Sequence, residues 1–196
     1  MQKIILASKS PRRKQILEQV GLDFEIEVSD FDETQIKFKT PQEMVEKLSL
    51  EKAKIIAQGN PDAIIIGADT TVIFRKEIIG KPKSKEDAFR ILSLLSGNTH
   101  EIVTGFTVIK GSKSITKHIT SKVKFKKLSE AEINAYVETG EPMDKAGGYG
   151  IQEKGGLFME NIEGDYFNVV GLPIFAVAEA LKEFGVEITK NWQIGT

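Results

Sequence analysis

The chain has no cysteine among its 196 residues, and only two histidines and one tryptophan. The absence of cysteine excludes disulfides, thiolate metal sites and cysteine nucleophiles, and it suits a reducing cytoplasm. His100 and His118 stand in separate strand-like segments without ligand spacing, so we expect ordinary strand or surface positions for both rather than a zinc site. Any chemistry must therefore rest on carboxylates, lysines, arginines, hydroxyls and amides.

The chain also has no excess of charge of one sign and no long apolar run. The 27 basic and 28 acidic residues give a net charge of -1, so we expect neither general nucleic-acid binding nor attraction to a membrane surface. The apolar run Ile4–Ala7 is too short for a signal peptide or a membrane span, which makes a cytoplasmic protein the expectation. With 40% hydrophobic residues, the chain is expected to form one domain over residues 1–196.

Strand-like and helix-like patterns alternate along the whole chain. Capping boxes or N-cap residues followed by apolar stripes predict helices after Thr40, Ser84 and Ser129, ending near Gly59, Gly97 and Gly140. Short hairpins combined with helical crossovers predict an α/β fold with a mixed sheet. Further helices are expected over 11–20 and from Pro173 to Gly185, and strands over 4–7, 24–28, 63–67, 100–109 and 114–125.

The segment after the first strand carries an unusual concentration of positive charge. Ser10 suits a helix N-cap and Pro11 the first helical position, so Arg12 and Arg13 fall in the first turn. Cations there oppose the helix dipole, whereas an anionic ligand would reverse the penalty, because free amides, hydroxyls and guanidiniums together favour phosphate. The alternatives are a polyphosphate site and an exposed, solvated basic turn.

Acidic residues give a second candidate site. Asp69 is predicted to follow directly the buried strand 63–67, at the sheet edge where α/β proteins bind ligands. An Asx turn supported by Thr70 is the alternative. Glu33 could join Asp69 in binding Mg²⁺ or Mn²⁺, which favour carboxylate and phosphate oxygens, unless it is only a solvated loop charge.

Two lysines and a glycine-rich segment complete the candidates. Lys81 lies between Gly80 and Pro82 in a position suited to phosphate, whereas Lys52 on an amphipathic helix would more often face solvent. In the segment 144–152 closely spaced glycines allow close approach to a ligand, and Gln152 offers a donor and an acceptor to a nucleobase edge. A flexible surface loop is the alternative. No P-loop or dinucleotide fingerprint follows a strand.

Taken together, these segments resemble the Maf family of nucleoside triphosphate pyrophosphatases, also described as septum formation inhibitors. The resemblance covers nearly the whole chain. The motifs that carry it are Ser8-Lys9-Ser10-Pro11-Arg12-Arg13, Gly67-Ala68-Asp69-Thr70, Gly80-Lys81-Pro82, Ser96-Gly97 with His100, Thr104-Gly105, the segment from Asp144 to Gln152, and Gly164-Asp165-Tyr166 through Gly171-Leu172-Pro173.

The resemblance implies hydrolysis of a nucleoside triphosphate between its α and β phosphates, with a divalent cation, Mg²⁺ or Mn²⁺. It implies a twisted mixed sheet flanked by helices, two lobes around a nucleotide-binding cleft, and frequently a homodimer. The resemblance also implies that Asp69 accepts the proton of the attacking water and, with Glu33, holds the metal. The triphosphate is then neutralised by Arg12, Arg13, Lys52 and Lys81, with hydroxyl contacts from Ser8 and Ser10.

Within the family, Arg12, Thr70 and Gln152 match the specificity positions of the branch that acts on dTTP and UTP. Thr71 replaces the small aliphatic residue expected beside Thr70. The alternatives are the sister branch that acts on 7-methyl-GTP and a non-catalytic regulator of septum formation. A housecleaning role toward modified pyrimidine nucleotides and a link to cell division follow as hypotheses.

Overall fold

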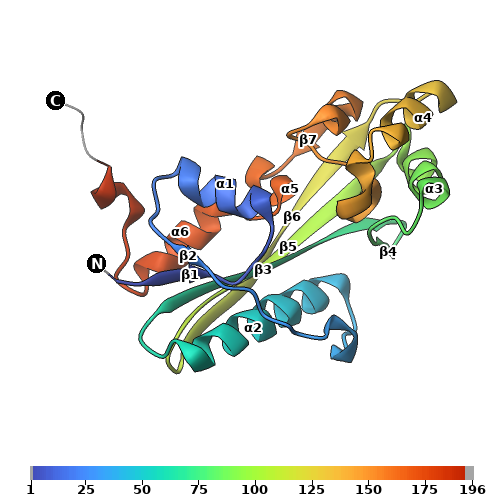
Figure 1. The fold of residues 1–196 in the computed structure, drawn as a ribbon. Coiled ribbons are helices and arrows are strands. Elements are labelled where there is room, and N and C mark those ends of the chain that lie inside the picture. Colours follow the sequence, from blue (N-terminus) through green and yellow to red (C-terminus); the bar gives the residue numbers. More distant parts are fainter. Residues whose placement is uncertain (1, 193–196) are drawn as a thin grey trace. The chain divides into compact units, whose positions relative to one another are not determined.

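The computed structural model describes residues 2–192 as a mixed α/β fold (Figure 1). Its sheet has seven strands in the order β2-β1-β3-β5-β6-β7, and β4 pairs with β3 off this path. Strand β1 is parallel to both β2 and β3, whereas the β3–β4 and β6–β7 pairs are antiparallel, so the predicted mixed sheet is confirmed. The strands are β1 (Ile4–Leu6), β2 (Glu25–Ile26), β3 (Ile64–Phe74), β4 (Glu77–Ile79), β5 (Thr99–Lys110), β6 (Lys113–Phe125) and β7 (Met159–Glu163).

Helices separate most of these strands along the chain. The α-helices are α1 (Pro11–Gln19), α2 (Pro41–Gly59), α3 (Lys85–Leu95), α4 (Glu130–Glu138), α5 (Tyr166–Val170) and α6 (Ile174–Lys182). Short 3₁₀ helices are η1 (Glu33–Gln35), η2 (Glu141–Asp144), η3 (Ala146–Gly148), η4 (Lys154–Phe158) and η5 (Ile188–Asn191). No helix in the described part of the chain is long and apolar enough to cross a bilayer.

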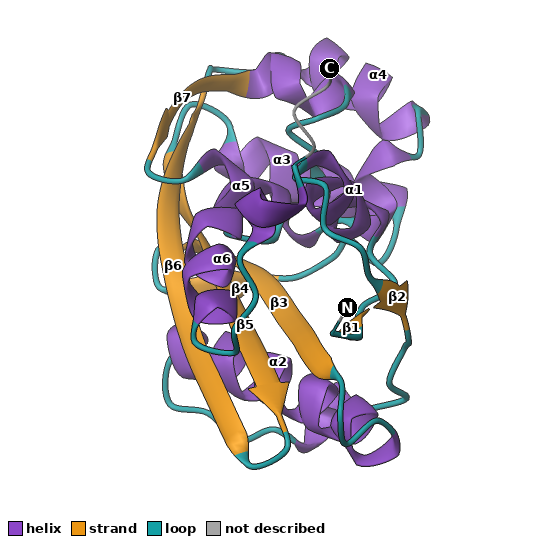
Figure 2. Ribbon diagram, turned by 90° about the vertical axis from the view of Figure 1, so that its left-hand side faces the viewer, coloured by secondary structure: helices purple, strands orange, loops and turns teal. Residues whose placement is uncertain are grey.

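The described chain divides into two compact units. The first comprises residues 2–69, 104–119 and 171–192, and the second comprises residues 70–103 and 120–170. The long strands β3, β5 and β6 each contribute residues to both units. Figure 2 shows β5 and β6 as long neighbouring strands, consistent with their order in the sheet.

In the first unit, α2 and α6 lie on opposite faces of the sheet (Figure 1). Alternation of side chains along a strand directs Ile5 and Ile65 toward α2, where they form a buried cluster with Ala53 and Ile56. The intervening residues of these strands, such as Leu6 and Ile66, are also fully buried. The strands are therefore apolar on both faces, as expected of a parallel part of a sheet.

In the second unit, α3 packs against α4 and against the segment that follows α4. Its core joins the apolar face of α3 (Ala88, Ile91, Leu92 and Leu95) to buried aromatic side chains. The rings of Phe125 and Phe158 meet edge to face with their centroids 6.1 Å apart. Buried aromatic side chains of this kind contribute a large share of the stability of a core.

The prediction that a strand ends before Asp69 is wrong. Strand β3 continues through Asp69 to Phe74, and Asp69 and Thr70 are its only residues that are not buried. The strand continues because residues 71–74 are apolar or β-branched and pair with β4 through Val72, Ile73 and Phe74. The alternative of an Asx turn at Asp69 is wrong for the same reason.

Most of the predicted helix starts are confirmed by side-chain caps. Thr40, Ser84 and Ser129 accept hydrogen bonds from the backbone three residues on, and Ser129 forms a complete capping box with Glu132. Ser10 occupies the N-cap position of α1, but its hydroxyl makes no cap bond. Pro173 is the N-cap of α6 rather than its first helical residue. The predicted strand over 24–28 shrinks to two exposed residues, β2.

Candidate active site

The approach of α2 to strand β3 determines which side chains meet in the first unit. A Cβ atom at Gly67 would lie 2.3 Å from the carbonyl oxygen of Ser49 and 3.0 Å from the Cβ of Ala53. Only glycine therefore allows the helix to pack this closely against the strand. Gly67 and Asp69 share one face of β3, and Lys52 lies on α2 between the two contact residues. The close packing brings Lys52 to Asp69.

Lys52 joins two carboxylates. Its Nζ donates a hydrogen bond of 2.7 Å to Oδ1 of Asp69 and forms an ion pair of 2.7 Å with Oε1 of Glu33. The side chains of Lys52 and Asp69 are each 15% exposed, so this pair is only weakly screened by water. Lys52 is thus not the solvent-facing helix lysine that its position alone would favour.

Glu33 owes its position to a local turn. Asp32 caps the short helix η1 by accepting hydrogen bonds from the backbone nitrogen and the hydroxyl of Thr34. These hydrogen bonds from Thr34 lower the pKa of Asp32 below its usual value. The turn directs Glu33, whose side chain is 56% exposed, to the ammonium of Lys52. Glu33 is therefore part of an organised cluster and not only a solvated loop charge.

Arg13 is anchored to main-chain oxygens. Its Nε donates to the carbonyl oxygen of Gly171 at 2.8 Å, and its Nη1 donates to the carbonyl of Ala68 at 2.8 Å and to the hydroxyl of Ser8 at 3.0 Å. These bonds connect the loop after β1, strand β3 and the stretch that begins at Gly171, all within the first unit. Anchored in this way, Arg13 supplies a fixed positive charge next to the residue that precedes Asp69.

The electrostatic surroundings of Arg13 link the basic turn to the acidic pair. Burial is the main cause that lowers the pKa of Arg13, the charge of Asp69 opposes this, and the neighbouring Arg12 adds to it. Two like charges in one turn are costly without an anion. Ser10 lies in the same turn, and its backbone nitrogen donates to the Ser8 hydroxyl at 3.3 Å. Ser8, Ser10, Arg12 and Arg13 thus lie together where helix α1 begins.

The other predicted residues belong to the second unit. Lys81 and Gln152 are both exposed, and Thr70 follows Asp69 in β3. Adjacent strand residues point to opposite faces, so the side chain of Thr70 points away from the face that carries Asp69. The site residues Glu33, Lys52, Asp69 and the basic turn are brought together in the first unit, while Lys81 and Gln152 lie on neighbouring segments of the second.

Two of the sequence motifs meet within the second unit. The backbone nitrogen of Gly147 donates to the carbonyl of Gly80 at 3.0 Å. Gly147 and Gly148 both have positive φ values, 72° and 70°, and a Cβ at Gly148 would lie 3.1 Å from Pro82. The turn that carries Lys81 therefore packs on the glycine-rich segment, which is largely buried and is not a flexible surface loop.

A buried histidine also holds the glycine-rich segment, a role the sequence did not predict. Nε2 of His100 lies 2.5 Å from the hydroxyl of Tyr149, and their rings meet edge to face. Burial lowers the pKa of His100 to about 4, so its ring is neutral at physiological pH. The expected strand position of His100, in β5, is confirmed.

The donor set next to Lys52 fits a hard divalent cation. Glu33 and Asp69 both contact one ammonium, so their two carboxylates lie close together. Mg²⁺ is commonly held by one or two carboxylates together with substrate phosphates and water. Within residues 2–192, no group of three His, Cys, Asp or Glu side chains could hold a metal ion by itself. Phosphate oxygens would have to complete the coordination.

Comparison with known proteins gives relatives over nearly the full length. The profile of the family described as Maf-like protein matches residues 3–184. A protein of Bacillus anthracis named dTTP/UTP pyrophosphatase is 49% identical over 189 residues, which cover 96% of this chain and 99% of that protein. A Bacillus cereus protein of the same name is 48% identical with the same coverage.

Solved structures resemble the chain more distantly. A Ham1 protein of Staphylococcus aureus aligns with a TM-score of 0.44 and 13% identity, over 63% of this chain and 72% of that one. A HAM1 protein of Coxiella burnetii aligns with a TM-score of 0.45 and 15% identity, over 64% and 73%.

Proposed function

The chain belongs to the family of Maf-like proteins, and on that premise we propose that it is a nucleoside triphosphate pyrophosphatase. It hydrolyses dTTP and UTP to the nucleoside monophosphate and pyrophosphate. The observation that carries the proposal is the ion-paired group of Lys52, Asp69 and Glu33 next to the basic turn that contains Arg13. A carboxylate base, a fixed cation and neighbouring carboxylate oxygens are what phosphoanhydride hydrolysis requires.

The positively charged side chains of the site bind the triphosphate in this mechanism. Arg12, Arg13, Lys52 and Lys81 neutralise the triphosphate, and the hydroxyls of Ser8 and Ser10 add hydrogen bonds. Arg13 is anchored by three protein oxygens and needs no reorganisation when charge develops. Fixed charges of this kind stabilise the transition state and the pyrophosphate leaving group.

Asp69 is proposed as the proton acceptor. The bond from Lys52 engages Oδ1 of Asp69 and fixes the orientation of the carboxylate. The proton of the attacking water then passes to the carboxylate as the water oxygen bonds to the α phosphorus and the bond to the pyrophosphate oxygen breaks. Asp69 and Glu33 would hold Mg²⁺ or Mn²⁺, which when bound neutralises charge on the phosphate oxygens.

Recognition of the base is assigned to Gln152, with Thr70 and Arg12 as further specificity positions. The amide of Gln152 presents a donor and an acceptor, and it can match the O4 and N3 edge that thymine and uracil share. This assignment favours pyrimidine triphosphates with that edge, in keeping with the name of the relatives in Bacillus.

The test is a panel of nucleoside triphosphates, including dTTP, UTP, dCTP, dGTP and 7-methyl-GTP, with and without Mg²⁺ or Mn²⁺. Monophosphate, pyrophosphate and orthophosphate are measured separately. We expect metal-dependent release of pyrophosphate from dTTP and UTP, reduced at least about a thousandfold in the variant Asp69→Asn. Asp62→Asn is the matched control, because Asp62 lies in an exposed turn outside the site.

Each other result has a definite meaning. Orthophosphate as the first product would show that a different bond is cleaved. A preference for 7-methyl-GTP would move the chain to the sister branch. No turnover with any nucleotide would contradict the proposal and favour the regulator.

A further inference from the structure

We propose that Glu141 is a positioning residue that fixes the turn carrying Gln152 and thereby sets the selectivity for the nucleobase. The inference rests on the proposed function, because that proposal assigns Gln152 to the base. Glu141 itself is expected to touch neither the substrate nor the metal. All the contacts that carry the argument lie within the second unit.

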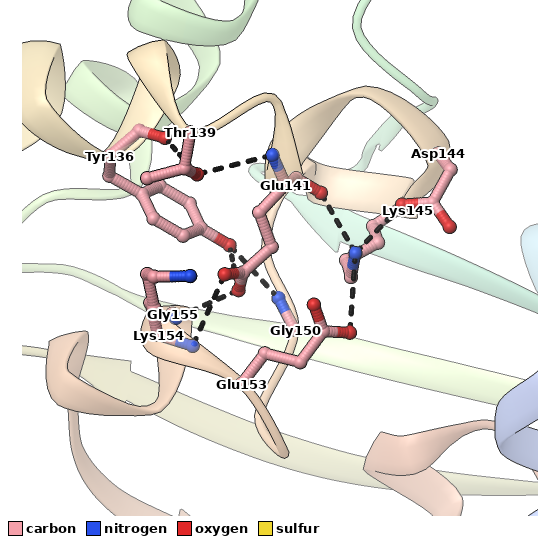
Figure 3. Close-up of polar contacts among 9 residues, drawn as sticks. All are labelled: Tyr136, Thr139, Glu141, Asp144, Lys145, Gly150, Glu153, Lys154 and Gly155. Carbon is pink, nitrogen blue, oxygen red and sulfur yellow. Dashed lines mark hydrogen bonds and ion pairs between the residues drawn. The ribbon is translucent and has the colours of Figure 1, made fainter.

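One carboxylate holds both ends of the turn (Figure 3). Glu141 Oε1 accepts hydrogen bonds from the hydroxyl of Tyr136 at 2.8 Å and from the backbone nitrogen of Gly155 at 3.0 Å, and its Oε2 accepts from that of Lys154 at 3.2 Å. The hydroxyl of Tyr136 in turn accepts from the backbone nitrogen of Gly150 at 3.3 Å. The segment 151–153 is therefore tied at its start through Tyr136 and at its end directly.

The hydroxyl of Tyr136 stays protonated and can donate its hydrogen bond throughout the working pH range. Burial, together with the hydrogen bond to Glu141, raises the pKa of Tyr136 well above its usual value. The phenol therefore keeps its proton and donates to Glu141 across the whole range of pH in which the enzyme would work. Its ring is held by an edge-to-face contact with Phe158, with the centroids 4.9 Å apart.

Lys145 supplies a second connection between Glu141 and the turn. Its Nζ donates to the backbone oxygen of Glu141 at 2.8 Å and to Oδ1 of Asp144 at 2.7 Å, and it lies 3.4 Å from Oε1 of Glu153. The side chain of Lys145 is only 6% exposed, so its charge depends on these oxygens. Glu153 directly follows Gln152, so this ion pair also restrains the turn.

The backbone around the turn is closely packed at three glycine positions. A Cβ at Gly150 would lie 2.7 Å from Cε of Lys145, and one at Gly155 would lie 2.7 Å from the hydroxyl of Tyr136. A Cβ at Gly156 would lie 2.6 Å from the carbonyl oxygen of Ile151. The backbone is thus packed directly on the side chains that hold it, while Gln152 remains exposed.

A fixed backbone matters because an amide discriminates between bases only when its donor and acceptor are held in one orientation. Loss of a hydrogen bond to a charged group is worth about tenfold or more in an equilibrium constant. In Glu141→Gln, the amide nitrogen replaces one carboxylate oxygen and cannot accept the hydrogen bonds that this oxygen received. The turn then loses either the bond from Lys154 or the bonds from both Tyr136 and Gly155.

The experiment compares Glu141→Gln with the wild-type protein using dTTP, dCTP and dGTP. We expect the KM for dTTP to rise about tenfold and the ratio of kcat/KM between dTTP and dCTP to fall by a similar factor, with kcat for dTTP within about twofold. Inorganic tripolyphosphate, which has no base, is the second probe. Its inhibition constant against dTTP should be the same in both proteins.

Two further variants separate positioning from general damage. Glu160→Gln carries the same substitution at an exposed residue of β7 that pairs with Lys124 away from the turn, and it should behave as the wild type. Tyr136→Phe keeps the ring and removes only the hydroxyl, so we expect a smaller change of the same kind. Tyr136→Phe also carries the test if Glu141→Gln does not fold.

The outcomes distinguish the inference from the function on which it rests. Unchanged selectivity in Glu141→Gln and Tyr136→Phe, with an active wild type, would overturn the inference alone. Equal weakening of dTTP and tripolyphosphate would do the same, because it would indicate general damage to the phosphate site. A wild type that releases pyrophosphate from no nucleotide would overturn the proposed function itself.

Discussion

At the scale of single residues, charged side chains in this protein are held by specific partners. Lys52 contacts Asp69 and Glu33 at 2.7 Å each, and Arg13 is bonded to three protein oxygens. The sequence predicted that these residues act together, but not how. It did not predict the bridge by Lys52 or the main-chain bonds of Arg13, because both depend on segments that are distant in sequence.

Removal of the Lys52 charge should lower the rate of the reaction. In Lys52→Gln the carboxylate of Asp69 loses its fixed cation, so we expect kcat to fall about 10² to 10³-fold. Lys54→Gln is the matched control, because Lys54 lies on the same helix and pairs with Glu51 of that helix. Steady-state kinetics with dTTP measure the effect. Equal kinetics in the two variants would contradict the role of Lys52.

His100 should make stability depend on pH. Its pKa is about 4 in the folded protein and about 6.5 when exposed, so the unfolded chain binds more protons between these values. Stability is therefore complete above about pH 6.5 and decreases as the pH falls toward 4, by roughly 2–3 kcal/mol from this residue. Urea unfolding at pH 7 and pH 4.5 should show a smaller difference for His100→Gln than for the wild type. An equal difference would show that His100 does not carry this effect.

At the scale of elements, the sequence predicted helices better than strands. Caps at Thr40, Ser84 and Ser129 define the helix starts by local hydrogen bonds, and these were correct. The predicted end of the strand that became β3 was wrong, because the polar residues Asp69 and Thr70 suggested that the strand stops there. Pairing with β4, which is not local information, carries the strand onward. The sequence predicted which residues form the site. It could not predict how they are arranged, because that depends on how α2 packs against β3.

The packing of α2 predicts a strong effect at Gly67. In Gly67→Ala the new Cβ would clash with the Ser49 carbonyl, so α2 must shift, and Lys52 moves with it. We expect about 1–3 kcal/mol of destabilisation and a large loss of kcat. At Gly59, the last residue of α2, an added Cβ would meet no atom within 4 Å, so Gly59→Ala should leave activity unchanged. Thermal unfolding and kinetics of both variants check this, and a fully active Gly67→Ala would contradict it.

At the scale of the molecule, each compact unit is assembled from separate stretches of chain. The second unit comprises residues 70–103 and 120–170, and the first supplies the residues between them. The expectation of one domain over residues 1–196 stays a prediction, as do the nucleotide-binding cleft, the homodimer and the link to cell division. The family assignment, in contrast, followed from the ordered motifs of the sequence and is confirmed.

A fragment of residues 70–170 should not fold cooperatively. It contains residues 104–119, which belong to the first unit, and it would lack the rest of that unit. Buried residues of this stretch, such as Phe106 and Val108, would then lose part of their surroundings. Thermal unfolding followed by circular dichroism should show no sharp transition for the fragment. A cooperative transition like that of the full chain would contradict this expectation.

The repeated passage of the chain between the two units also constrains how such a protein can change over generations. The boundaries at residues 69/70, 103/104, 119/120 and 170/171 mean that no single continuous piece of the gene encodes either unit. Recombination with another gene at one breakpoint would join parts of both units to foreign sequence. Exchange of one continuous stretch of the gene therefore cannot transfer either unit alone, neither the unit that carries Lys52 nor the unit that carries Gln152.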